Sequence, residues 1–550
     1  MNSGKVAVLL GFAANLAMAF SAWGQAPTDA LKLGVTTHFS QGWPARYWDL
    51  VETGQIASIR DSLHWRLIEA TPGQIIFTEA NSRHIRRACD AGKRVLLGID
   101  PRNPLYDSGQ TAFSPEARAA FARYILAIAD RFGDCIAGVE IGNEINAKNN
   151  MTGSAALDRP KSYTAIVKAV HDAVKPAHPA FQILGGSTNM IATGFLDHLF
   201  DAGALAYIDG VVVHPYRQDP ANLDSELARL TAAIRRHGVD KPIWATEFSR
   251  DFAAPEDAPP FLAKMVTQMS AAGVGDAYWY ALVDQKYFPT MGLYTGAGSP
   301  NPAALAYDYL ARELLPRGRA IRVNAGDHSV FHFRFGADRQ IIWGARRPFS
   351  VSGHAVFRDS QGRMIPQPYE IGENPVVIEG DAAVELGSAN ILADSLYGYG
   401  EAPWSYFAKR GTAAPLPLVP IDWNWTSFIG HPALKPIAVN QFGLNPGGNA
   451  VVPITVTIRY TAQASGQVYA SACLAKQKPT GDGVTLQIAH DGAAVGPVEI
   501  VATEYRATRM INVAAGDTID FIVGPNRTPL TDSVRYRFRI ALTPQDAATC

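Results

Sequence analysis

Two glutamates in the first half of the chain are set among residues that could support acid–base chemistry. Glu144 follows an asparagine in the segment VEIGNEIN, and Glu247 lies in the segment PIWATEFS. Cleavage of a glycosidic bond commonly uses two carboxyl groups. One protonates the leaving oxygen, and the other attacks the anomeric carbon or activates water. A lone glutamate of this kind is more often a solvated or salt-bridged loop residue than a catalytic one. Which of the two interpretations holds for this pair depends on the elements that position it.

Short apolar runs alternate with amphipathic segments from about residue 31 to residue 316, which predicts strands separated by helices. The predicted strands are Leu31–Thr36, Ile56–Arg60, Arg94–Ile99, Ile136–Gly142, Gln182–Gly186, Gly210–His214, Pro242–Thr246 and Asp276–Leu282. Strands that alternate with helices imply a parallel sheet, and this many units fit a closed (β/α)8 barrel. A doubly wound open sheet is the structural alternative, but no glycine-rich phosphate loop follows the first strand.

Catalytic groups of such barrels sit at the carboxyl ends of the strands. Polar and aromatic residues follow all the predicted strands at this end: His38, Arg60, Asp61, Asp100, Asn143, Glu144, Ser187, Thr188, His214, Tyr216, Glu247, Trp279, Tyr280 and Asp284. The fourth and seventh strands lie across the barrel from each other, which can bring Glu144 and Glu247 face to face. This arrangement favours a catalytic role for the pair.

With these residues, the segment from 31 to 316 resembles the glycoside hydrolases of clan A, a superfamily of retaining (β/α)8 enzymes. The Asn143-Glu144 pair matches the position of the clan's acid/base, and Glu247 matches its nucleophile. The resemblance implies double displacement through a covalent glycosyl-enzyme. Within the clan, the sequence is most similar to family 39, including members that act on bacterial exopolysaccharides, although families 5 and 30 share these motifs.

The resemblance also implies supporting roles around the nucleophile. Arg60 matches an arginine that supports this glutamate, and Tyr216, in the His214-Pro215-Tyr216 motif, matches a tyrosine that hydrogen-bonds to it. A nearby positive charge and a hydrogen bond would both keep Glu247 ionised. Asn143 is expected to hold the 2-hydroxyl of the sugar.

Other residues are expected to line the sugar subsites. The resemblance implies that Trp279 floors a subsite, and His38 and Trp65 either line subsites or pack in the core. Glu140 has the same strand parity as Glu144, and we interpret it as a buried, hydrogen-bonded structural residue. No His/Asp cluster requires a catalytic metal, and no cofactor is expected.

After the barrel, assigned to residues 27–317, long helical patterns give way to short alternating stretches. These predict a small β-sandwich over residues 318–395 and a jelly-roll-like β-domain over residues 396–550. Trp423 and Trp425 on the last domain form either a sugar platform or an aromatic seam packed against the barrel.

The N-terminal segment, residues 1–26, predicts a signal peptide. Lys5 supplies a positive charge, Val6–Phe20 is a short apolar stretch, and small residues follow. Cleavage is expected after Gly24 or after Ala26. The apolar stretch is too short for a good transmembrane helix. We therefore expect export to the periplasm or the extracellular space, with no membrane insertion after cleavage.

The four cysteines lack metal-site spacing, and an exported protein can form disulfides. Cys89 and Cys135 each precede a predicted strand, so a Cys89–Cys135 bridge is plausible, with Cys473–Cys550 as the second. Four unpaired thiols are the alternative.

The composition is that of a globular protein, with 47% hydrophobic and 18% charged residues. A formal net charge of -1 gives no basic excess, so no nucleic-acid partner is expected. We expect a monomer that acts on a polysaccharide. The alternatives are a transglycosylase that uses the same two glutamates and a non-catalytic carbohydrate-binding or adhesion protein.

Overall fold

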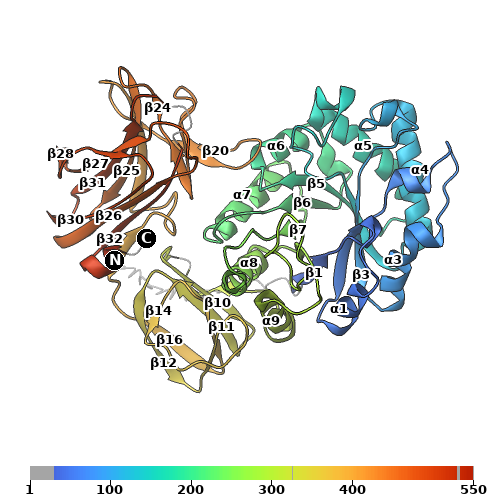
Figure 1. Cartoon of the computed structure of the whole chain (residues 1–550), viewed down its shortest axis with the longest axis horizontal. Coiled ribbons are helices and arrows are strands. Elements are labelled where there is room, and N and C mark those ends of the chain that lie inside the picture. Colours follow the sequence, from blue (N-terminus) through green and yellow to red (C-terminus); the bar gives the residue numbers. More distant parts are fainter. Residues whose placement is uncertain (1–29, 325, 529–532, 549–550) are drawn as a thin grey trace, which may run out of the picture.

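The computed structural model describes residues 30–324, 326–528 and 533–548. The predicted signal peptide and Cys550 lie outside these residues. The chain forms a barrel in its first part and two β-domains after it, coloured blue to green, yellow, and orange to red in Figure 1.

The predicted (β/α)8 barrel is confirmed, because strands β1 to β8 close into one barrel in chain order. Neighbouring strands are parallel, and β1 pairs with β8 to complete the closure. The strands are β1 (Lys32–Thr36), β2 (Ser58–Ser62), β3 (Arg94–Ile99), β4 (Ile136–Ile141), β5 (Ile183–Asn189), β6 (Gly210–His214), β7 (Ile243–Phe248) and β8 (Asp276–Trp279). Each one overlaps an apolar run identified in the sequence.

The helices that surround the barrel begin at recognisable caps. Ser114 precedes α4 and accepts a hydrogen bond from the backbone N–H of Ala117, and Pro115 occupies the first turn. The helices are α1 (Tyr47–Thr53), α2 (Trp65–Ile68), α3 (Glu79–Asp90), α4 (Pro115–Phe132), α5 (Arg159–Val174), α6 (Thr193–Asp201), α7 (Leu223–Arg236), α8 (Ala258–Ala272) and α9 (Pro302–Tyr309). Within the described ranges, no helix has the length and apolar character needed to span a membrane.

A small apolar cluster packs among the barrel strands, with one buried residue from each strand between β3 and β8. Its members are Leu96, Ala137, Leu184, Val212, Trp244 and Tyr278. Side chains of this size fill the interior of a barrel, so it is a packed core and not a pore.

The smaller β-domain consists of two facing antiparallel sheets of five and three strands, in the orders β13-β15-β11-β10-β9 and β14-β12-β16. Its strands are β9 (Ile321–Arg322), β10 (Val330–Phe335), β11 (Arg339–Gly344), β12 (Arg347–Gly353), β13 (Val356–Arg358), β14 (Glu370–Ile371), β15 (Val376–Glu379) and β16 (Ala382–Leu386). An apolar core that includes Val330, Ile342 and Phe357 lies within it.

The C-terminal β-domain has two larger sheets that enclose a separate apolar core. Its elements are β17 (Ile391–Asp394), β18 (Trp404–Arg410), β19 (Leu416–Pro417), β20 (Val419–Ile421), β21 (Phe428–Gly430), β22 (Ala438–Asn440), β23 (Gly443–Asn445), β24 (Gly447–Gly448), β25 (Pro453–Thr461), β26 (Gly466–Lys476), β27 (Val484–His490), β28 (Ala493–Ala494), β29 (Glu499–Val501), β30 (Glu504–Val513), β31 (Thr518–Pro525), β32 (Val534–Ala541) and α10 (Pro544–Ala548). β17, which lies within the range predicted for the smaller domain, pairs with β32 of this one.

The loop after β20 reaches back across the domain boundary to α6 of the barrel (Figure 1). Gly194 leaves room for the backbone there, since a Cβ atom at this position would lie 2.7 Å from Asp422 and Trp423. Arg229 on α7 pairs with Asp422 at 2.5 Å. The backbone of this loop therefore packs on the barrel, while the Trp423 side chain is 53% exposed.

A disulfide joins Cys89 to Cys135 with a Cα–Cα distance of 5.6 Å and a sequence separation of 46. Cys89 lies near the end of α3, and Cys135 directly precedes β4, so the bridge ties a surface helix to a barrel strand. The predicted Cys89–Cys135 pairing is thus confirmed. The Cys473–Cys550 pairing stays a prediction.

Replacing both Cys89 and Cys135 by serine should lower the free energy of unfolding by about 2–4 kcal/mol, because the closed loop no longer restricts the unfolded chain. Urea unfolding of wild type and the double variant measures this difference. Equal midpoints and slopes would contradict the expectation.

Candidate active site

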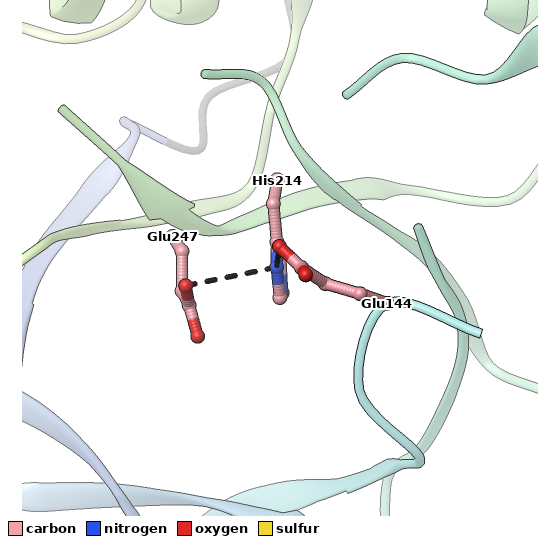
Figure 2. A group of neighbouring side chains, drawn as sticks. All are labelled: Glu144, His214 and Glu247. Carbon is pink, nitrogen blue, oxygen red and sulfur yellow. Dashed lines mark ion pairs between the residues drawn. The ribbon is translucent and has the colours of Figure 1, made fainter. Parts of the chain in front are cut away.

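A cleft of about 920 Å³ opens at the carboxyl ends of the barrel strands, and both Glu144 and Glu247 line it. Glu144 follows β4, and Glu247 is the next-to-last residue of β7. The two side chains approach each other, with an oxygen of each within 4.8 Å of the other and of a ring nitrogen of His214. Figure 2 shows the His214 ring between the two carboxylates.

A tight turn after β4 aims Glu144 into the cleft. Gly142 has a φ of 81°, and a Cβ atom there would lie 2.7 Å from the Cγ2 atom of Ile145. Glu144 itself has a φ of 46°, which is uncommon for a residue with a side chain. The backbone is thus held in an unfavourable conformation at the residue proposed to transfer protons, as is typical of functional sites.

Arg60 connects the cleft to the barrel interior. Its Nη1 atom donates to Glu247 at 2.6 Å, its Nε atom donates to Glu140 at 2.8 Å, and its Nη2 atom donates to Asn143 at 3.3 Å. The guanidinium is planar and carries its donors in a fixed fork, so it fixes the positions of its partners relative to one another. Burial disfavours its charge, but the two glutamates outweigh burial and raise the pKa of Arg60.

The second oxygen of Glu247 accepts a hydrogen bond from the Tyr216 hydroxyl at 2.7 Å. Burial alone would raise the pKa of Glu247, but the charges of His214 and Arg60 and the Tyr216 hydrogen bond together lower it. Glu247 therefore stays ionised at neutral pH, as a nucleophile requires.

His214 is fully buried at the end of β6. Its Nε2 atom lies 3.2 Å from Glu140, and its Nδ1 atom lies 3.5 Å from Glu144 and 3.7 Å from Glu247. Burial would lower the pKa of His214, but the surrounding carboxylates outweigh it and raise the pKa to about 9. The ring is thus positively charged at neutral pH.

Glu140 anchors this network below the cleft. It is fully buried and accepts hydrogen bonds from Arg60 and the Ser187 hydroxyl, with His214 as a third partner. Burial would raise the pKa of Glu140, but Arg60 and His214 lower it instead. The interpretation of Glu140 as a buried, hydrogen-bonded structural glutamate agrees with this geometry.

Asn189, the last residue of β5, is a site residue that the sequence reasoning missed. Its Nδ2 atom donates to an oxygen of Glu144 at 2.6 Å. The predicted strand ended at Gly186, whereas the pairing of β5 with β6 is irregular between Gly185 and Thr188 and continues to Asn189. A strand end placed three residues later would have included Asn189 among the candidates.

Comparison with known proteins agrees with this geometry. Residues 140–307 match a family described as the glycosyl hydrolase catalytic core. This segment runs from β4 into α9 and contains both Glu144 and Glu247. No curated protein matches the chain.

Among solved structures, a family 39 glycoside hydrolase from Bacteroides cellulosilyticus WH2 shares the fold. It is 17% identical, with a TM-score of 0.53 over 64% of this chain and 81% of the other. A family 39 enzyme from Xanthomonas axonopodis pv. citri is 15% identical, with a TM-score of 0.45 over 94% of this chain and 95% of the other. The matched catalytic-core segment and the fold shared with the first of these structures agree with the resemblance to glycoside hydrolases.

The structure brings most of the predicted site residues to the cleft. Arg60, Asn143, Tyr216 and His38 line it together with the two glutamates. The His38 ring lies edge-on to Tyr280, with ring centroids 5.6 Å apart.

Trp279 and Trp65 are buried in the core and do not lie at the sugar subsites that were considered for them. Trp279 is 0% exposed, its ring packs among Phe248 and Phe252 outside the barrel, and its Nε1 atom donates to Met291. Side chains alternate along a strand, so the neighbour of inward-facing Tyr278 points outward. Tyr280 lines the cleft in its place.

Trp65 belongs to the core under the β3–α4 region. It is stacked on Tyr106 and Tyr124, and its Nε1 atom donates to Glu69 at 2.7 Å. Of the two interpretations open for Trp65, core packing is the one that the structure supports.

Replacing Glu140 by glutamine should lower the pKa of His214, because a buried negative charge beside its ring is lost. It should also lower the free energy of unfolding by about 3–5 kcal/mol, since Arg60 loses a buried partner. NMR titration of the imidazole and urea unfolding measure the two effects. Glu256→Gln, an exposed position, is the control, and an unchanged His214 titration would contradict this account.

The stability of the protein should depend on His214 in a specific pH window. Its pKa is raised from 6.5 to about 9, so the charged ring contributes fully below pH 6.5 and loses its contribution as the pH rises through 9. The destabilisation caused by His214→Gln should therefore shrink by up to about 3 kcal/mol between pH 6.5 and pH 9.5. Urea unfolding at several pH values tests this, and a destabilisation independent of pH would refute it.

Proposed function

We propose that the protein is a retaining glycoside hydrolase that cleaves a β-linked polysaccharide by double displacement. The observation that carries the proposal is the approach of the Glu144 and Glu247 oxygens to within 4.8 Å. Retaining enzymes hold their carboxyl groups about 5–5.5 Å apart, whereas inverting enzymes need about 6.5–9.5 Å to admit a water molecule.

The surroundings of the two glutamates support the role proposed for each. Glu247 accepts hydrogen bonds from the Arg60 guanidinium and the Tyr216 hydroxyl, which favour its ionised form, and its side chain is 12% exposed. Both carboxyl groups face the charged His214 ring, but the hydrogen bond that Glu144 accepts comes from the neutral amide of Asn189, and its side chain is 22% exposed. The more strongly stabilised anion suits the nucleophile, and the more accessible carboxyl suits proton exchange with the leaving group and with water.

In the first step, Glu247 attacks the anomeric carbon while Glu144 gives its proton to the departing oxygen, so the glycosidic bond breaks as an ester bond forms. In the second, Glu144 takes a proton from water, whose oxygen attacks the same carbon and releases Glu247. Each step inverts the anomeric centre, and the two together retain its configuration. The Asn143 amide, held by Arg60, is available to the 2-hydroxyl of the sugar.

A bacterial exopolysaccharide is the proposed substrate, and the proposal includes export of a monomeric enzyme. The signal-peptide-like segment, the resemblance to exopolysaccharide-active family 39 members and the Cys89–Cys135 disulfide support this view. The catalytic groups described above all come from a single chain, so one copy suffices for the reaction.

The test is the release of reducing ends from a panel of bacterial exopolysaccharides and plant β-glycans. Wild type should cleave at least one polymer, and Glu247→Gln should reduce the rate about a thousandfold or more, because the nucleophile is lost. Glu256→Gln, on the loop after β7 but outside the cleft, should leave the rate unchanged.

Equal release by wild type and Glu247→Gln would overturn the assignment of the nucleophile. Product that appears only when an acceptor sugar is added would identify a transglycosylase. Binding to a polymer without any release would favour the carbohydrate-binding alternative.

A further inference from the structure

The C-terminal β-domain holds the barrel loops beside the active site. The Gln441 amide donates to the carbonyl of Ala221, and the Asn222 amide donates to the carbonyl of Leu396 at 2.9 Å. These two bonds run in opposite directions across the same boundary. They fix the start of α7, directly after the loop that carries Tyr216.

A second contact reaches the acid/base. The Asn146 amide donates to the carbonyl of Asn424 at 2.9 Å, and its oxygen accepts from the backbone N–H of Asn189. Asn189 in turn donates to Glu144. The C-terminal domain is thus connected to a catalytic carboxyl through two hydrogen-bonded asparagines.

The turn between β22 and β23 extends this domain into the cleft itself. Phe442, at the tip of the turn, lines the cleft together with barrel residues such as Met190 and Gln218. The side chain of Asn440 accepts hydrogen bonds from the backbone N–H groups of Phe442 and Gly443, at 3.0 and 2.8 Å. Gln441, almost fully buried, fastens the turn to the barrel, so the position of Phe442 is fixed before a ligand arrives.

The Phe442 ring is partly exposed. Within the described part of the chain, it stacks on no other aromatic ring and belongs to neither the barrel core nor the C-terminal core. An aromatic ring that lines a cleft on a hydrogen-bonded turn is suited to contact the apolar face of a sugar ring.

We propose that Phe442 forms a sugar-binding subsite for a unit of the polysaccharide other than the one attacked by Glu247. The inference rests on the proposed function and extends it, since a subsite built from a second domain selects a chain of several sugars over a single glycoside. The C-terminal domain is then a part of the substrate cleft and not a separate appendage.

Affinity electrophoresis in gels that contain soluble xylan, mixed-linkage β-glucan, galactomannan or xanthan tests the proposal without requiring turnover. Glu247→Gln should be slowed by at least one polymer. Adding Phe442→Ala should raise the apparent Kd about tenfold, because the ring face is lost, and adding Phe442→Trp should preserve binding. Tyr369→Ala, which removes an exposed ring from the smaller β-domain, should change nothing.

Equal retardation with and without Phe442→Ala would overturn the subsite, as would the absence of retardation in every gel. The reducing-end assay separates this result from the proposed function. If binding depends on Phe442 but wild type cleaves no polymer, the subsite stands and the hydrolase is rejected. If cleavage depends on Glu247 but Phe442→Ala leaves binding unaltered, the hydrolase stands and the subsite is rejected.

Discussion

The site depends on the fork of Arg60, which binds a buried glutamate with one edge and the proposed nucleophile with another. A guanidinium in a barrel interior is costly unless it is paired, and Glu140 supplies a fully buried counter-charge. The same carboxylate contacts His214, which then carries a positive charge between Glu144 and Glu247. Two cations and three carboxylates are thus held in a small volume, and Glu247 stays ionised because both cations face it.

The barrel and the C-terminal domain both contribute to the cleft around this network. The barrel supplies the proposed catalytic groups from strands that a packed interior and a disulfide hold in place. The C-terminal domain contacts the loops after β4 and β6, and it contributes Phe442 to the cleft wall. A second subsite at Phe442 fits this geometry, because the ring reaches the cleft from a separate domain and belongs to neither the barrel core nor the C-terminal core.

The sequence predicted the barrel and the approach of the two glutamates because each depends on a local pattern: apolar runs for the strands, and polar residues directly after them for the cleft. Trp279 was misplaced because strand parity, and not residue type, decides which way a ring points; its inward neighbours are Tyr278 and Tyr280. Asn189 was missed because an irregularity lengthens β5 beyond its apolar run. Phe442 reaches the cleft through contacts between residues more than 200 positions apart, which no local pattern encodes.

The most direct test of the central claim is to trap the covalent intermediate on Glu247. Activated 2-deoxy-2-fluoro β-glycosides slow both steps, and with a good leaving group the second step becomes limiting, so a glycosyl-enzyme accumulates. Mass spectrometry of the intact protein and of its peptides should show one added fluorosugar on the peptide that contains Glu247, with none in Glu247→Gln. A label on another carboxylate, or turnover of the polymer with inverted configuration and no trapped species, would contradict the account.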